Sequence, residues 1–428
     1  MQSELRRSLS LWGLVFTGII MIQPTAPMPL FGVVHETARG HVVSAILVAM
    51  LGMMLTAFSY GRMAAAYPVA GSASSYVGRE VHPLAGFLAG WSMMMDYILN
   101  PVICTIWCAG AMRNFFPESP VELWRVLFAA TFTFFNLRQI QTTARINLGL
   151  TMAMGLVILA MVFASLRYVF AQPGPINWLA PIYDPNNFSL ATFSAGTSLA
   201  VLTYIGFDGI STLSEEVKDA QRNILRGIVI VCLVIGLLSA MESYVAQLVW
   251  PYGEKLPDID TAYVHIAGRA GGPWLFSIVN FTLIVATIGS GSGGVLAGAR
   301  LLYGMSREGG LPKTFFSRIS AGTGIPAANV VLIGTCALIG SFLLSYQAGA
   351  ELLNFGAFIG FMGVNLSALL HYGVRKRGKW WEWLAPLGGF SICAFLFWNL
   401  SNASKINGSI WLAVGVAWYL FRRRRGDA

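Results

Sequence analysis

The sequence predicts an all-α membrane protein with twelve transmembrane helices, and three observations carry that prediction. The chain of 428 residues is 56% hydrophobic and only 11% charged, whereas a soluble domain carries about 25% charged residues. Apolar runs of about 18 residues or more recur along the chain, and each is long enough to cross a bilayer as a helix. Lysine and arginine gather in alternate connecting segments, as in chains that cross a membrane repeatedly.

The twelve predicted spans follow one another with short connections. We place them at 10–34, 41–66, 84–112, 121–137, 145–170, 189–214, 224–250, 273–304, 326–347, 351–373, 382–400 and 408–421. The longest linkers, about 171–188 and 251–272, are too short for a separate domain.

The net charge of +9 follows from topology. With the N-terminus inside, most of the 28 lysines and arginines face the cytoplasm, as the positive-inside rule requires. We therefore expect a bacterial inner-membrane protein in contact with the lipid bilayer, with both termini cytoplasmic, and no nucleic-acid partner. The five cysteines are scattered through apolar segments without a cluster of histidines or carboxylates, so neither a metal nor a cofactor is expected.

The first span contains a segment that a regular helix does not accommodate. Three prolines occur within six residues, and each lacks an N–H and clashes with the preceding turn. This segment reads Gln23-Pro24-Thr25-Ala26-Pro27-Met28-Pro29. It is either a proline kink or a true interruption. An interruption at membrane depth requires a cavity or protein around it, and Gln23, Thr25, Ala26 and Met28 then become candidate substrate-binding residues.

The sixth span contains a second irregular segment, in which Gly206 and Gly209 flank Asp208. Glycine permits unusual backbone angles, and an acid inside the membrane is by default a functional candidate. Asp208 binds substrate or caps the second half-helix, and the two roles are compatible. Tyr204 and Phe207 flank the segment and offer aromatic faces to an ammonium group.

The two irregular segments lie five spans apart, in spans one and six. Because five is odd, a second unit of five spans is inverted relative to the first, and interrupted helices at matching positions indicate a transporter site. We expect a first repeat at residues 1–170, a second at 171–375, and accessory spans with a basic tail at 376–428.

Five further positions carry polar groups inside or near the predicted spans. Asp96, beside Tyr97, binds a cationic group or is hydrogen-bonded to a neighbouring helix. Glu242 joins a proton path or makes a structural pair. Glu216 pairs with an arginine such as Arg62 or Arg300 in a gate, or lies at a solvated helix end. Ser290 and Ser292, in a run of small residues, either contribute to an ion site or permit close helix packing.

The chain resembles the amino acid–polyamine–organocation transporters. The matching segments are Phe58-Ser59-Tyr60-Gly61, Gly86-Phe87-Leu88-Ala89-Gly90-Trp91, Ile205-Gly206-Phe207-Asp208-Gly209 and Ala299-Arg300-Leu301-Leu302-Tyr303-Gly304-Met305-Ser306-Arg307-Glu308-Gly309, with residues 67–73 and 215–218. The resemblance covers about residues 10–375 and implies the five-plus-five inverted-repeat fold of the bacterial leucine transporter. Within the family, the chain is most similar to the putrescine importers, on the proline-rich first span, Phe58–Gly61, and Gly90-Trp91-Ser92 with Asp96-Tyr97.

Three departures from the family pattern matter. Amino acid carriers of the family place a glycine-rich run in the first break, whose amides bind the substrate carboxylate, but Pro24 and Pro27 have no amide to offer. The putrescine branch carries an additional acid just after this break, where this chain has Leu30-Phe31-Gly32. Some proton-coupled relatives carry a lysine in the fifth span, where this chain has Met154.

These observations predict a secondary transporter that imports a small organic cation, putrescine or another polyamine, coupled to H+ or Na+. The alternative is an amino acid permease or an amino acid/amine exchanger, in which the amides of Thr25, Ala26 and Met28 bind the carboxylate. An enzyme is excluded by the lack of a nucleophile or metal motif, and a channel by the lack of a pore-lining repeat.

Overall fold

The computed structural model describes residues 9–67, 72–138, 144–215, 217–307, 311–320, 325–376 and 379–424. Within these ranges the chain folds into α-helices joined by loops, with two 3-10 segments, one π segment and an isolated backbone bridge between Leu9 and Val217.

The helices of the first half are α1 (Leu11–Ile22), α2 (Pro27–Thr37), α3 (Val42–Ala66), α4 (Ser72–Glu80), α5 (Pro83–Arg113), α6 (Val121–Leu137) and α7 (Ala144–Ala171). The second half contains α8 (Leu190–Ala200), η1 (Val201–Tyr204), η2 (Asp208–Glu215), α9 (Ala220–Val249), α10 (Ala262–Arg307), α11 (Lys313–Phe316), α12 (Ala327–Leu343), α13 (Tyr346–Ala368), η3 (Leu369–Arg375), α14 (Trp381–Trp398) and α15 (Asn402–Arg424).

Seven of the described helices are long and apolar enough to cross a membrane, or up to nine if each bent pair is one span. One bent pair is α1 with α2, at 58°, and the other is α14 with α15, at 112°. Each of the twelve predicted spans lies on helical structure, although α6 and α12 have only 17 residues each. The prediction of an all-helical, multi-pass membrane protein is confirmed.

Two segments differ from the sequence prediction. The second half of the expected linker 251–272 is helical, because α10 begins at Ala262. Asp258 Oδ1 accepts hydrogen bonds from the Thr261 amide (2.8 Å) and hydroxyl (3.0 Å) just before that helix. The helix is then kinked at Gly272 (φ 76°), immediately before Pro273. The short helix α4 was not predicted, because its polar sequence has no span-like hydropathy.

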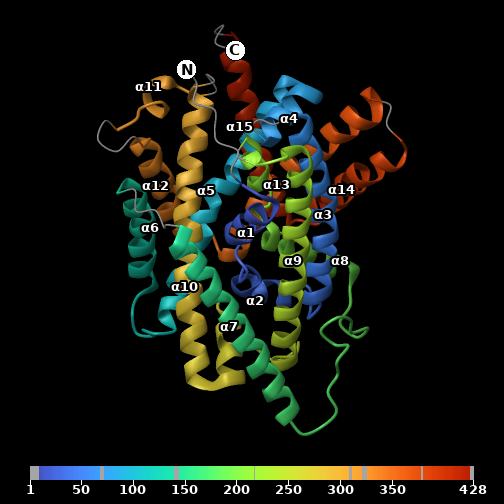
Figure 1. Cartoon of the computed structure of the whole chain (residues 1–428). Coiled ribbons are helices and arrows are strands. Elements are labelled where there is room, and N and C mark those ends of the chain that lie inside the picture. The colour runs from blue at the N-terminus through green and yellow to red at the C-terminus, as the bar shows by residue number, and fades with distance from the viewer. Residues whose placement is uncertain are drawn as a thin grey trace.

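The interrupted pair α1–α2 lies in the middle of the bundle, and longer helices surround it (Figure 1). Helix α3 packs along α9, and α5 packs against α13 and α10. Glycines permit these close approaches: a Cβ on Gly61 would lie 2.6 Å from Leu225 Cα, and one on Gly294 would lie 2.6 Å from Asn100 Oδ1. Within the run of small residues in α10, Gly294 permits the close packing against α5.

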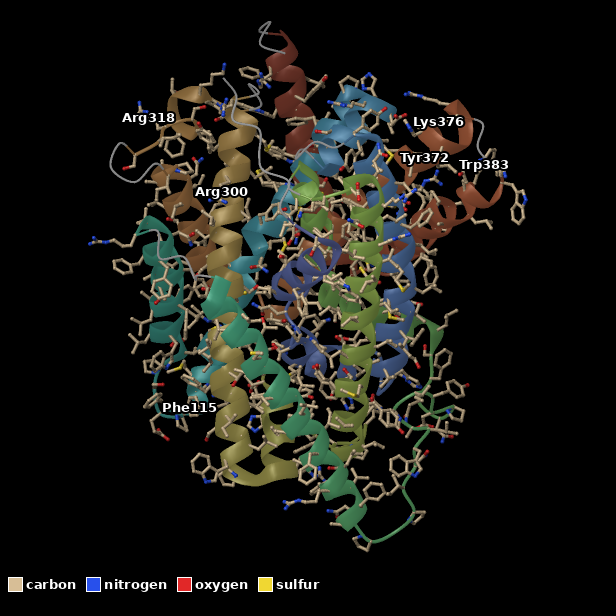
Figure 2. All side chains as sticks on the ribbon, viewed as in Figure 1. Phe115, Arg300, Arg318, Tyr372, Lys376 and Trp383 are labelled. Carbon is tan, nitrogen blue, oxygen red and sulfur yellow. The ribbon has the colours of Figure 1, made fainter. Side chains whose placement is uncertain are left out.

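The two ends of the bundle differ. Helices α4 and α11 and the end of α15 gather at one end, while the loop after α7 and the kink of α10 lie at the other (Figure 1). Arg318 and Lys376 point outward at the first end, and Phe115 lies toward the opposite one (Figure 2).

Candidate functional site

The first irregular segment is an interruption rather than a kink. Helix α1 ends at Ile22, and Gln23 has a positive φ of 74°, which takes the chain out of the helix. The Gln23 side chain donates from Nε2 to the carbonyl oxygen of Ala286 on α10, at 2.9 Å. This bond ties the interruption to the neighbouring helix.

Most backbone amides of the first interruption are already used or missing. The Ala26 amide donates to the Gln23 carbonyl (3.2 Å), and the Met28 amide donates to the Thr25 carbonyl (3.1 Å). Pro24 and Pro27 have no amide hydrogen. A substrate carboxylate therefore finds few donors here, in contrast to the exposed amides of an ordinary helix N-terminus.

The second irregular segment is also an interruption. The chain leaves η1 at Ile205, passes through Gly206 with φ 108°, and enters η2 at Asp208. A positive φ of this size favours glycine. The Asp208 carboxylate lies near the backbone amides of Gly206, Gly209 and its own residue, at the start of η2.

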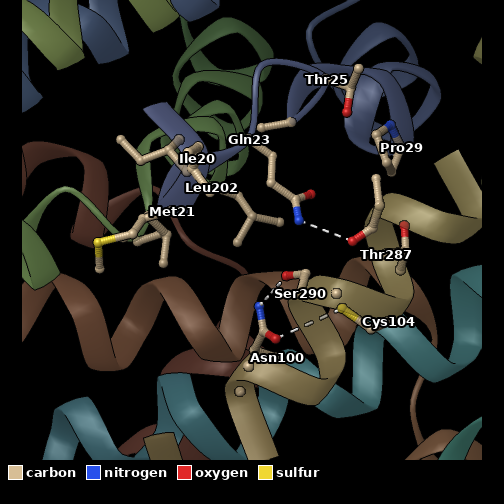
Figure 3. A pocket seen from close by; sticks show the side chains of 18 of the residues that line it. Ile20, Met21, Gln23, Thr25, Pro29, Asn100, Cys104, Leu202, Thr287 and Ser290 are labelled. Atoms are coloured by element: carbon tan, nitrogen blue, oxygen red, sulfur yellow. Dashed lines mark hydrogen bonds between the residues drawn. The ribbon is translucent and has the colours of Figure 1, made fainter. Parts of the chain in front are cut away.

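A cavity of about 450 Å³ lies between the two interruptions, a size typical of small-molecule sites (Figure 3). Helices α1, α2, α5, α7, α10 and α13 and the segment from η1 to η2 contribute to its wall. Seven of the sequence-predicted residues line it: Gln23, Thr25, Ala26, Asp96, Tyr97, Asp208 and Ser290.

The described residues of the cavity wall include two acids and no cationic side chain. Asp96 is 6% exposed and Asp208 is 5% exposed, and their carboxyl groups are close enough to interact electrostatically. Among the described residues that line the cavity there is no lysine, arginine or histidine. Two carboxyl groups in one buried site repel each other when ionised, so a cation that enters between them relieves both desolvation and repulsion.

Helix ends of both signs of partial charge face the cavity. Residues 20–22, the last of α1, line the cavity, as does Ile205 just beyond η1. The final carbonyl groups of a helix lack intrahelical partners and carry partial negative charge. The first residues of α2 and η2, whose amides carry partial positive charge, line the cavity as well, so the negative character of the wall comes from Asp96 and Asp208 rather than from the backbone.

Five predicted residues lie outside the cavity wall. The Tyr204 hydroxyl donates to the Ile46 carbonyl on α3 at 2.9 Å. Phe207 packs its ring 5.5 Å from Tyr60 and 5.1 Å from Phe361. The remaining three are Met28, which is 1% exposed, Ser292, whose carbonyl accepts from Asn136, and Glu242, which is fully buried on α9.

Only part of the expected gate lies within the described residues. Glu216 lies outside the described residues. Arg62 pairs with Glu382 at 3.3 Å and lies 3.6 Å from the centre of the Tyr372 ring, so its observed partner is on α14 rather than near η2.

The sequence analysis missed several residues of the wall. Asn100 Nδ2 lies 3.5 Å from Ser290 Oγ, and the Cys104 thiol lies 3.8 Å from Asn100 Oδ1 (Figure 3). Both follow Asp96 on α5 at intervals of four, and residues so spaced share one helix face. That spacing was the signal that could have found them. Met154 also lines the cavity and places an apolar thioether in its wall.

Comparisons with known proteins agree with this architecture. The family model described as amino acid permease matches residues 9–420. The low-affinity putrescine importer PlaP of Escherichia coli (strain K12) is 32% identical over 96% of this chain and 93% of its own. The branched-chain amino acid permease BcaP of Bacillus subtilis (strain 168) is 25% identical over 99% and 94%. The vacuolar cationic amino acid transporter 4 of Arabidopsis thaliana is 26% identical over 86% and 63%.

Proposed function

The chain belongs to the amino acid permease family, and we propose that it is a secondary active transporter that imports a small organic cation, putrescine or another polyamine, by alternating access. As a permease it moves its substrate across the membrane unchanged and is not an enzyme. The observation that carries the choice of substrate is the pair Asp96 and Asp208 in a cavity whose described wall has no cationic side chain.

Each acid has a separate part in this proposal. Asp96, on α5, accepts one ammonium group. Asp208, at the start of η2, accepts the other while its carboxylate stays near the amides of Gly206 and Gly209. Gln23, Thr25, Ala26, Tyr97 and Ser290 supply the remaining polar wall. Met28, Tyr204 and Phe207 lie behind the wall, where they support it.

The proposed architecture is twelve transmembrane helices with a five-plus-five inverted repeat. The two interruptions support it, because one falls in residues 1–170 and the other in 171–375. Residues 376–428 then form accessory helices, including α14 and α15. We place the protein in a bacterial inner membrane with both termini cytoplasmic, because Arg318 and Lys376 lie at one end of the bundle (Figure 2) and belong to the connecting segments in which the sequence gathers most lysines and arginines.

The second candidate is an amino acid permease or exchanger. It draws support from the relatives named as branched-chain and cationic amino acid carriers. The structure gives it less support, since the Ala26 and Met28 amides already donate within the interruption.

Uptake into proteoliposomes separates the two candidates. Ornithine is the matched competitor, because it is putrescine with one carboxylate added. We expect saturable uptake of radiolabelled putrescine that ornithine inhibits only weakly and that Asp208→Asn abolishes. Saturable ornithine uptake without putrescine uptake would favour the amino acid permease.

A further inference from the structure

Glu242 is a buried acid outside the proposed substrate cavity. Its residue is 0% exposed on α9, and neither carboxyl oxygen has a hydrogen-bond partner among the described residues. The hydroxyls of Ser239 and Ser243 are buried and equally unpartnered there. Residues at these spacings share one helix face, so three polar groups without partners meet within about one turn.

Burial without a hydrogen-bond partner determines whether the Glu242 carboxyl group is ionised. An ionised carboxylate without a partner costs several kcal/mol in a protein interior. No salt bridge to Glu242 is found in the described part of the chain. In this conformation the side chain is therefore neutral and carries a proton.

Glu242 lies close to α2, the second half of the interrupted helix. The Tyr263 hydroxyl, on α10, donates to the Glu242 backbone carbonyl at 3.4 Å. Tyr263 meets Phe31 of α2 edge to face, with ring centres 5.8 Å apart, and Phe31 stacks on His35 at 5.3 Å. The rings of α2 and α10 thus pack beside the segment that holds the acid.

Helix α2 connects the buried acid with the substrate cavity. Pro29 lines the cavity, whereas Phe31, two residues later, contacts Tyr263. At about 100° per residue these two side chains point to nearly opposite sides of the helix. A movement of α2 that opens or closes the cavity therefore also changes the packing around Glu242.

We propose that Glu242 carries the proton that is exchanged in each transport cycle, a step that rests on the transport function proposed above. With α2 packed as observed, the carboxyl group holds its proton. When α2 moves and water reaches the group, the O–H bond breaks, the proton passes to water and the carboxylate remains until it is protonated again from the opposite side. Among the described residues, two titratable groups on neighbouring elements lie toward Glu242. Tyr263 of α10 contacts its backbone carbonyl, and His35 of α2 stacks on Phe31, which contacts Tyr263.

The test compares proton coupling with substrate exchange in proteoliposomes. Glu242→Gln keeps the shape of the protonated acid but cannot release a proton. We expect this variant to exchange putrescine across the membrane like the wild type when no gradient is present. Accumulation driven by an acidic exterior should fall to the level of empty vesicles, while the wild type accumulates without sodium.

Glu351 on α13 provides the matched control. It is 7% exposed, and its two carboxyl oxygens accept from Gln347 (3.1 Å) and Ser404 (3.0 Å). Glu351→Gln should therefore retain proton-driven accumulation. Proton-driven accumulation that survives in Glu242→Gln would overturn the proposal, as would wild-type accumulation that requires sodium and ignores the pH gradient.

Two further arms keep the outcome decisive. If Glu242→Gln does not fold, Glu242→Asp retains a titratable group. We expect Glu242→Asp to keep proton coupling with a shifted pH dependence, and an unchanged pH dependence would contradict the role of Glu242.

If the wild type neither binds nor exchanges putrescine, the substrate proposal fails. Proton-driven accumulation of leucine and of arginine is then compared between the wild type and Glu242→Gln. Accumulation that survives in Glu242→Gln overturns the proton role of Glu242, independently of the substrate proposal.

Discussion

Two regions of this molecule bury carboxyl groups, and they differ in whether those groups have cationic partners. At the end of the bundle where α4 lies, the fully buried Glu80 side chain accepts from the Tyr67 hydroxyl, lies 2.6 Å from His371 Nδ1 and pairs with Arg375 at 2.8 Å. In the central cavity, Asp96 and Asp208 have no cationic side chain beside them among the described lining residues. The acid with cationic partners belongs to the scaffold, and the acids without a cationic partner are available to a ligand.

The pKa of the Glu80 carboxyl group reflects its pairing. Burial alone raises the pKa of a carboxyl group. At Glu80 this effect is outweighed by the hydrogen bonds from Tyr67 and His371 and by the charge of Arg375, so its pKa lies below the ordinary value. The cluster joins the end of α3, α4 and the π segment η3, and π segments often mark functional positions.

The largest expected effect is on stability, from the paired acid. Glu80→Ala removes a buried partner from three groups, and breaking a buried pair costs about 3–5 kcal/mol. We expect a fall of several degrees in Tm in detergent, with putrescine affinity unchanged in the remaining folded protein. Glu382→Ala is the control, because its pair with Arg62 is partly exposed and worth at most about 1 kcal/mol. Equal losses in the two variants would contradict the distinction.

The sign of the pH effect at Glu80 follows from its lowered pKa. A carboxyl group with a lower pKa in the folded state stabilises the fold above its unfolded pKa, and this stability is lost as pH falls through the folded value. The Tm difference between wild type and Glu80→Ala should therefore shrink in acid. A difference that grows on acidification would be inconsistent with this pairing.

The next effect is on binding, from an unpaired acid. Asp96→Asn keeps the size of the side chain but removes its charge, and a hydrogen bond to a charged group is worth about 1.5–3 kcal/mol. Titration calorimetry should show putrescine affinity reduced about 10- to 100-fold, while Tm without ligand stays equal or rises. Unchanged affinity would remove Asp96 from the site.

A smaller effect is expected from the backbone of the second interruption. Gly206 has φ 108° but no atom closer than 3.6 Å to an added Cβ, so Gly206→Ala costs backbone strain of about 1–2 kcal/mol rather than a clash. Gly253, with φ 100° in a loop and open space around it, is the matched control. Both alanine variants should lower Tm similarly, but only Gly206→Ala should weaken putrescine binding.

The smallest effect concerns Asp260, in the loop before α10. Burial, the nearby Asp258 charge and, in the opposite direction, Arg125 leave the pKa of Asp260 at about 6, above its ordinary 3.8. Because the folded pKa is raised, the group stabilises the fold below pH 4 and loses that contribution as pH rises through 6. Asp260→Asn should therefore raise stability by about 1 kcal/mol above pH 7 and not below pH 4. Thermal unfolding at the two pH values measures this difference.

The sequence predicted the interruptions but not the direction of every side chain around them. Pro24, Pro27 and Gly206 restrict the backbone locally, so their effect is visible in the chain itself. The directions of Tyr204 and Phe207 depend on how the broken helix packs against α3 and α13, and helical periodicity does not extend through a break.

The same contrast holds for the two acid-rich regions. Asp96 and Asp208 stand out because they are acids within apolar segments. The partners of Glu80 could not be predicted, since His371 is 291 positions away along the chain and only the tertiary fold brings the two together.

The most direct test of the central claim is calorimetric titration of the purified wild type and Asp208→Asn with putrescine and with ornithine. If the unpaired acids recognise a cation, putrescine binds the wild type more tightly than ornithine, and Asp208→Asn loses putrescine binding. Tighter binding of ornithine, with putrescine affinity unchanged in Asp208→Asn, would contradict the account.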